Sequence, residues 1–370
     1  MTPASALPEH SATPRRPWTP FPAPDTSDPT LPPVTVVLDR HDEQAFMTSA
    51  FAAHRPSHGR ITVHPTPAAA APAYLAHDLL RALGKHLPTP HWTTEAPWAS
   101  HTDKSWRVAA AWIHALKVTH LLVCRAHRIT ARNWEHLLAL RERARLHLTL
   151  LCNGPLPPAP TRLLAGINHQ RLDTLTAARQ HWHPSHPPQP ATGYPWWKAT
   201  AAFPPKPDEP WFRLPPQPRH PRPGGLTRST RAQPTDPIPS AVLPVPIEPR
   251  QHDTHPSIVE VAARIHTRIA HPVHAASVAV RVLTGRTPRQ IGHLHGSELK
   301  PSGTDSKSRG PRLHLPTWTT PLMDAALALA DLRGDTDVPN PLRIPIWEEN
   351  EIEDATAACR LIPSPPARRS

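Results

Sequence analysis

VTHLLVC, at residues 118–124, is a nearly continuous apolar run, and LHLTLLC, at residues 146–152, repeats the pattern. Strands that are covered by helices on both faces of a sheet have this pattern. Between the two runs, ARNWEHLLALRERA (131–144) has apolar residues at helical spacing, and Thr130 is positioned to cap its amino terminus. We therefore predict two central parallel strands joined by a helix, the repeating unit of an α/β fold.

The same alternation extends toward the amino terminus. VTVVL (34–38) and RITVH (60–64) are short β-branched runs, and EQAFMTSAFAAH (43–54) between them has helical spacing. APAYLAHDLLRALGKHL (71–87) and DKSWRVAAAWIHAL (103–116) are further predicted helices. With right-handed crossovers, these elements give a three-layer, mostly parallel α/β sheet.

Proline divides the chain into parts. There are 54 prolines among 370 residues, and proline-dense stretches neither build helices nor donate to sheets. We predict a proline-rich arm at 1–33, an α/β domain at 34–170, a linker rich in Pro, His and Trp at 171–254, a small, mainly helical domain at 255–335 and a flexible tail at 336–370. The tail contains the acidic run WEENEIED, which is typical of a solvated face or a flexible arm.

The helical domain has a readable order. Its predicted elements are the helices SIVEVAARIHTRIA (257–270), PVHAASVAVRVLTG (272–285) and PRQIGHLHG (288–296), a short strand RLHLP (312–316) and a last helix PLMDAALALADLRG (321–334). Proline at the start and glycine at the end of the second helix favour a tight turn into the third.

Charge and cysteine content restrict the partners and the compartment. Lys plus Arg number 41 against 29 Asp plus Glu, a net charge of +12, which favours polyanionic partners such as DNA. Alternatively, a compositional bias toward Arg, Ala, Pro and His produces this charge without any binding.

Cys124, Cys152 and Cys359 form neither an even set nor a metal-binding spacing, so we predict a reducing compartment without disulfides. The sequence has no apolar run of signal-peptide or membrane-spanning length, so we predict a cytoplasmic protein with no membrane partner.

Taken in order, the 34–170 segment resembles the AAA+ ATPases that serve as helpers in DNA transposition and secretion. ITVHPTPAAAAPAYLAHDLLRALG (61–84) is similar to the second strand and following helix of that family, THLLVCRAHRIT (119–130) to its Walker B strand and LTLLCNG (148–154) to its sensor strand. The resemblance implies a P-loop-like fold, and it places Asn153 at the sensor position that orients the attacking water in active members. The alternative is a buried strand in some other α/β fold.

This resemblance makes a geometric prediction. Walker B and sensor strands are neighbours in that family, which would bring Cys124 and Cys152 near one another at the carboxyl ends of their strands.

The catalytic residues of the family are missing from the matching positions. A hydrolysing P-loop enzyme needs a glycine-rich phosphate loop with a lysine, a hydroxyl on magnesium and a Walker B carboxylate. Here DRHDEQAF (39–46) follows the first strand, and GxxxxGK[ST] occurs nowhere in the sequence. Cys124 and Arg125 occupy the Walker B acid positions, but a thiol is a poor magnesium ligand and an arginine cannot act as a base. We predict no catalytic residue, no cofactor and no nucleotide hydrolysis.

The stretch VAVRVLTGRTPRQIGHLHGSEL (278–299) is similar to a helix-turn-helix, whose second helix enters the major groove. This resemblance makes Arg289, Gln290 and His293 candidates for base contacts and Arg286 a candidate for a phosphate contact. An alternative is a helical bundle packed against the first domain, with an ordinary Thr-Gly helix end.

The same stretch with GPRLHLPTW (310–318) also resembles part of the tyrosine recombinase catalytic domain. No HxxR motif follows in the proper place, and Tyr74 and Tyr194 are far from the nucleophile position. Such a domain would bind DNA without cutting it.

These observations leave three hypotheses of function. The first is a DNA-associated accessory protein of mobile-element or plasmid biology, with a non-hydrolysing assembly domain for an unidentified protein partner and a basic DNA-binding domain. The second is a protein-interaction scaffold that does not bind nucleic acid. The third is an active ATPase or recombinase-type enzyme.

HWHPSH (181–186) has no carboxylate or thiol beside it, so we predict no metal site.

Overall fold

A computed structural model gives the structure of the protein. It describes residues 31–67, 71–87, 97–183, 257–294, 313, 315–334, 340–342, 349–359 and 361. The predictions for residues 1–30 and 184–254 lie outside these ranges.

One parallel β-sheet forms the centre of the amino-terminal part. Its strands are β1 (Val34–Asp39), β2 (Arg60–Val63), β3 (His120–Val123), β4 (His147–Asn153) and β5 (His169–Leu172), in the spatial order β2-β3-β4-β1-β5. The predicted parallel α/β sheet is therefore confirmed, and the two long apolar runs supply its neighbouring strands β3 and β4. β5 pairs with β1 at the edge and spans the predicted boundary between the α/β domain and the linker, at residues 170 and 171.

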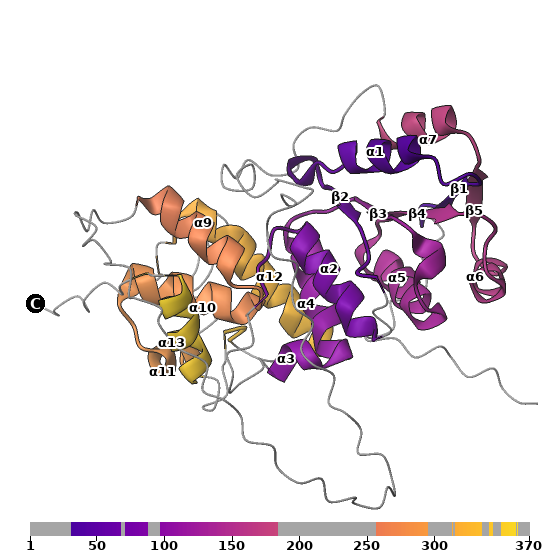
Figure 1. The fold of residues 1–370 in the computed structure, drawn as a ribbon. Coiled ribbons are helices and arrows are strands. Elements are labelled where there is room, and N and C mark those ends of the chain that lie inside the picture. The colour runs from indigo at the N-terminus through magenta and orange to yellow at the C-terminus, as the bar shows by residue number, and fades with distance from the viewer. Residues whose placement is uncertain are drawn as a thin grey trace, which may run out of the picture.

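Helices lie against both faces of this sheet (Figure 1). One face carries α2 (Pro72–Ala82), α3 (Pro97–Ser100), α4 (Thr102–Ala115), α5 (Ala131–Ala144) and α6 (Pro158–Leu164), and the other carries α1 (Gln44–Ala52) and α7 (Leu175–Trp182). The short 3-10 turns are η1 (Pro56–His58) and η2 (Ala126–Arg128). Thr130 caps α5 as predicted, because its side chain accepts a hydrogen bond from Asn133 N at 3.3 Å.

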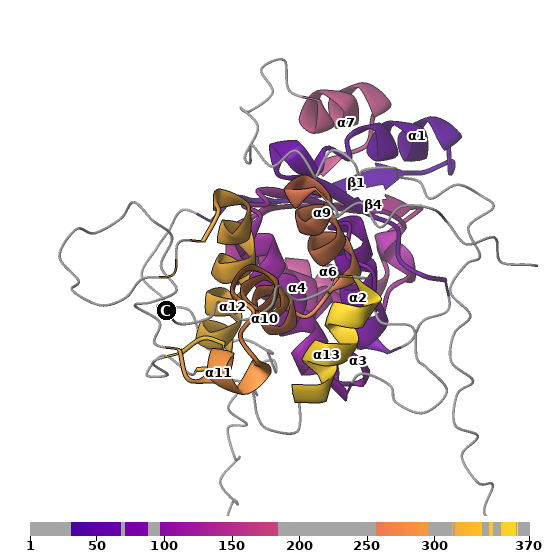
Figure 2. The ribbon, with the colours of Figure 1, turned by 90° about the vertical axis from the view of Figure 1, so that its left-hand side faces the viewer.

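Residues 257–361 contribute further helices. These are α9 (Ile258–Arg268), α10 (Pro272–Thr284), α11 (Pro288–Gly292), α12 (Thr320–Arg333) and α13 (Glu349–Ala358), with the 3-10 turn η3 (Thr317–Thr319) before α12. Figures 1 and 2 show α9, α10 and α12 gathered beside α4. The described residues of RLHLP, Leu313, Leu315 and Pro316, are not in a strand, unlike the prediction.

Helix α4 explains why these helices join the sheet domain. It is buried on nearly all sides because α2 and α5 cover one side and α12 covers another. Trp112 is fully buried, and its Nε1 donates to the carbonyl of Ala270 at 2.6 Å. The apolar residues of α4, α10 and α12 form one continuous core.

Lys85 is buried where these two parts meet. Its side chain is 1% exposed, and Nζ lies 2.7 Å from Nδ1 of His266 and 2.8 Å from the carbonyl oxygen of the same residue. The ammonium position is also 3.3 Å from the centre of the Trp112 ring. Burial lowers the pKa of Lys85 well below 10.5 and the pKa of His266 well below 6.5.

Two stretches differ from their predicted state. Residues 175–182, predicted as linker, form α7 because Thr174 caps the helix and Ala178 and Trp182 bury against the sheet. Residues 349–358, predicted as flexible tail, form α13, whose Ile352 is fully buried in the common core.

Candidate site at the carboxyl edge of the sheet

The residues that end β1, β3 and β4 meet at one edge of the sheet. Asp39 is paired with Asn153, and Val123 with Leu150, so Cys124 and Arg125 emerge beside the end of β4. In open parallel sheets, ligands bind in crevices outside the carboxyl ends of the strands. The sequence-predicted positions around Cys124, Arg125 and Asn153 therefore do come together.

The loop between β1 and α1 is folded around its own carboxylate. Asp39 is 1% exposed, and its Oδ1 accepts hydrogen bonds from the backbone N–H groups of His41 at 3.3 Å and Glu43 at 3.1 Å. These are the donors that a phosphate loop would direct at its ligand. Asp42 and Glu43 add two acidic side chains at the same point, so a phosphate here would meet negative charge.

Cys124 is a buried thiol. It is 0% exposed, and burial raises its pKa to about 12, which keeps the sulfur protonated at neutral pH. Cys152 is buried in the same way, and its pKa is also raised to about 12. The two strands are neighbours, as predicted, but the thiols pack on opposite faces: Cys124 with the α1 and α7 residues, and Cys152 in the core beneath α4 and α5.

Arg125 has a left-handed backbone, with φ of 49° and ψ of 37°. Such a conformation is uncommon for a residue other than glycine and stores strain. Its Nε is buried and has no hydrogen-bond partner within the described residues. Arg125 therefore supplies a cation, and no proton acceptor, at the position of the expected catalytic acid.

Asn153 is held by residues from two neighbouring loops. Its backbone N–H donates to Nδ1 of His127 at 3.0 Å, and its side-chain Nδ2 donates to a carboxylate oxygen of Asp42. The sensor-like amide is therefore engaged with the loop after β1 rather than directed at open solvent.

A cleft of about 390 Å³ lies between α1 and the loops that follow β2 and β3. It is lined by Asp42, Gln44, Met47, Thr48, Phe51, His64 and Arg125. Burial is the main cause of a lowered pKa at His64, and the charges of nearby Arg125 and Arg128 lower this pKa further. The lining mixes apolar surface with one arginine and one carboxylate already bound by Asn153, which does not make a set for metal-assisted hydrolysis.

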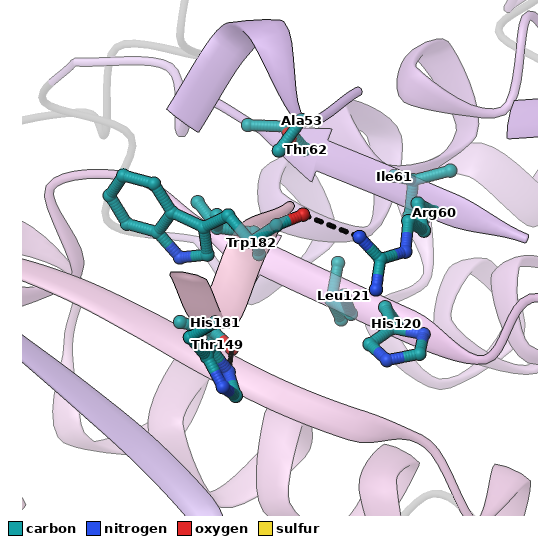
Figure 3. Close-up of a pocket in the computed structure, with 10 residues that line it drawn as sticks. Ala53, Arg60, Ile61, Thr62, His120, Leu121, Thr149, His181 and Trp182 are labelled. Atoms are coloured by element: carbon teal, nitrogen blue, oxygen red, sulfur yellow. Dashed lines mark hydrogen bonds between the residues drawn. The ribbon is translucent and has the colours of Figure 1, made fainter. Parts of the chain in front are cut away.

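At the opposite edge of the sheet His120, His147 and His181 lie near one another, and Figure 3 shows His120 and His181. Of the three, the sequence patterns singled out only His181, within HWHPSH. The rings of His120 and His147 stack with centroids 4.6 Å apart, and His181 Nε2 lies 3.0 Å from Thr149 Oγ1. Burial, then Arg60 and the neighbouring histidines, lowers the pKa of His120 to about 3. The space among these side chains is about 20 Å³, which suits at most a water molecule.

No group of three or more His, Cys, Asp or Glu side chains in the described ranges is arranged to hold a metal ion. Burial lowers the pKa of His147 and His181 as well, which favours the neutral rings, and His120 and His147 stack at the first residues of β3 and β4.

The candidate DNA contacts surround the turn between α10 and α11. Arg289, Gln290 and His293 are exposed, and Arg286 is half-buried. Gln290 Oε1 accepts from the backbone N–H of Thr287 at 2.9 Å, while Thr287 Oγ1 accepts from Gln290 N at 3.4 Å. This capping box uses the Gln290 amide to start α11, a helix of only 5 residues.

Comparison of the chain with protein-family models, with curated proteins and with solved structures finds no match. Among the helices that the structure describes, none combines the length and the apolar character that a bilayer crossing requires.

Proposed function

We propose that the chain is a DNA-associated accessory protein, with a P-loop-like, three-layer α/β domain that does not hydrolyse nucleotide and basic carboxyl-terminal helices that bind DNA. The α/β domain serves as an assembly surface for a protein partner in the cytoplasm. The adjacent positions of β3 and β4, with Asn153 at the end of β4, support the P-loop-like interpretation.

The observation that carries the non-hydrolysing assignment is the hydrogen bonding of Asp39. Its carboxylate already takes the N–H groups of His41 and Glu43, and the adjacent Asp42 and Glu43 repel a phosphate. With a thiol at Cys124, the position that follows β3 also lacks the oxygen ligand that magnesium prefers.

The charge of the carboxyl-terminal helices supports the DNA assignment. Residues 257–294 contain five arginines and a single acidic residue, Glu260. Such a concentration of arginine favours contacts with phosphates.

Two measurements on the full chain test this function. Titration with a fluorescent ATP analogue and magnesium should give no saturable binding, and a phosphate-release assay with and without DNA should give no turnover. Turnover that is lost in Asn153→Ala would overturn the non-hydrolysing assignment in favour of an active enzyme.

Fluorescence anisotropy of labelled duplex DNA tests the second half. The affinity should fall steeply as salt rises, because binding through several phosphates releases counterions. Absence of binding at low salt would rule out the DNA assignment.

A protein-interaction scaffold is the second candidate. It is favoured by the short α11 and by the use of Gln290 as a helix cap, which leave few side chains to read base edges. Under this alternative, the chain would fail to bind DNA at any salt concentration while its α/β domain still bound a protein.

A further inference from the structure

Helix α13 and the helices beneath it have opposite charges. The stretch 257–294, which includes α9, α10 and α11, has five arginines against Glu260 alone. α13 has four carboxylates in its 10 residues and neither lysine nor arginine. In the structure α13 packs against α10 and α11 (Figure 1), so these opposite charges are brought together.

Two side-chain contacts join α13 to α10, and one of them is an ion pair. Nε2 of His274 lies 3.5 Å from Oε2 of Glu351, and Nη1 of Arg281 lies 3.7 Å from Oε1 of Glu353. His274 and Arg281 are two helical turns apart, so they lie on the same side of α10 at a separation of about 10 Å. Two carboxylates of α13 therefore lie along one face of α10.

The far end of α13 contacts α9. Arg268 Nη1 donates to the carbonyl of Ala358 at 2.9 Å, where a cation also interacts favourably with the negative end of the helix dipole. Ile352 is the fully buried apolar side chain of α13. The Arg281–Glu353 ion pair, the Arg268 hydrogen bond and the apolar burial of Ile352 together hold this helix.

We propose that the face of α9 and α10 that α13 covers is the DNA-binding surface, and that α13 occupies it in place of the phosphate backbone. This inference rests on the proposed DNA association and moves its main contacts from α11 to Arg268, His274 and Arg281. α13 and DNA therefore compete for these three side chains, and α13 has the advantage of belonging to the same chain.

The exposure of the pairs is compatible with exchange. The side chain of Glu353 is 61% exposed and that of Arg281 is 18% exposed, so the carboxylate lies at the solvent side of the contact. A phosphate that replaces it forms a planar, two-bond contact with the guanidinium. An exposed ion pair contributes little stability, so exchanging the Glu353 carboxylate for a phosphate at Arg281 costs little by itself.

The experiment measures the affinity of full-length variants for a labelled duplex by fluorescence anisotropy at low salt. We expect E353Q to bind about two- to fivefold more tightly than the wild type, and E351Q/E353Q to bind about three- to tenfold more tightly. D354N is the matched control, because it removes the same charge from an exposed position of the same helix. Its effect should stay below about twofold.

A double-mutant cycle locates the contact. R281Q should weaken binding, and E353Q should no longer strengthen it in the R281Q background, because the two side chains then have nothing to exchange. Thermal unfolding of each variant shows whether it is folded. We expect E353Q to fold like the wild type, because the Glu353 side chain is exposed and outside the core.

Each other result is decisive. If D354N strengthens binding as much as E353Q, or if E353Q still strengthens binding in the R281Q background, α13 acts only through overall charge and the inference is overturned. If R289Q weakens binding and R281Q does not, the DNA contact lies on α11, and the inference fails while the proposed function stands. If neither the wild type nor any variant binds DNA, the proposed function fails, and the inference fails with it.

Discussion

Replacing Lys85 with methionine should remove a pH dependence of stability that this one side chain creates. Burial holds the pKa of Lys85 well below 10.5. Between that lowered pKa and 10.5, the unfolded chain binds a proton that the folded chain does not, so the free energy of unfolding rises with pH. The slope is at most about 1.4 kcal/mol per pH unit, or at most about 2 kcal/mol between pH 7 and 8.5.

The stability of Lys85→Met at a single pH is less informative than its slope. Methionine removes the cost of burying an amine, but it leaves Nδ1 and the carbonyl of His266 without their donor, at a cost of about 1–3 kcal/mol. These opposing effects do not change between pH 7 and 8.5, because the pKa of His266 lies well below this range. The difference in slope therefore belongs to Lys85.

Urea unfolding, followed by tryptophan fluorescence across this pH range, measures the slope. Burial raises the pKa of Cys124 and Cys152 to about 12 and that of Cys359 to about 11, so the folded thiols stay protonated and stability falls as pH passes the unfolded value of 9.0. Both proteins share this contribution, and it cancels in their difference. Lys117→Met, at an exposed lysine, is the control and should retain the wild-type slope. Equal slopes in wild type and Lys85→Met would refute the reasoning.

Three further predictions concern other described residues. Acidification from pH 7.5 to 5.5 should lower the free energy of unfolding by at least about 4 kcal/mol through three half-buried histidines, because the unfolded chain takes up protons below pH 6.5. Their pKa values are about 4 for His54 and His77 and about 3 for His120. An unchanged urea midpoint would contradict this. Asp39→Ala should cost about 1–3 kcal/mol, since two loop N–H groups lose their acceptor, and urea unfolding at pH 7 should detect the loss; a variant as stable as the wild type would mean that water replaces the carboxylate. Arg145→Gly should add about 0.5–1 kcal/mol, because Arg145 ends α5 with a φ of 52° that glycine adopts without strain; a lower melting temperature would count against it.

The sequence was sufficient to predict the centre of the sheet. The apolar runs at 118–124 and 146–152 became β3 and β4, side by side, because their side chains are buried on both faces. β5 was missed because His169–Leu172 has no apolar pattern and joins the sheet edge through backbone hydrogen bonds to β1. β5 forms because β1 offers it a free hydrogen-bonding edge, and a local sequence pattern does not show which strand lies at the edge of a sheet.

The sequence was sufficient to place the candidate residues at the ends of their strands, but not to give their contacts. Cys124, Arg125 and Asn153 lie at the expected strand ends, but the role of Asp39 depends on a turn that directs two N–H groups back at one carboxylate. Likewise, the opposite orientations of Cys124 and Cys152 follow from strand register, which sequence spacing does not supply.

Helix α13 shows a different limit. Its acidic composition indicated a solvated segment, and the side chains that contact its carboxylates, Arg281 and His274, lie about 70 residues earlier in the chain. A helix stabilised by distant charges gives little local sign of where it packs.

The covering of α4 by α12 has a consequence for synthesis. Thr102, at the start of α4, and Thr320, at the start of α12, are 218 residues apart. At ordinary translation rates, α4 leaves the ribosome roughly 10–45 s before α12. For that interval the nascent chain presents Trp112 and its apolar neighbours to the cell without their covering helix, so newly made chains should be substrates for chaperones until the last helices emerge.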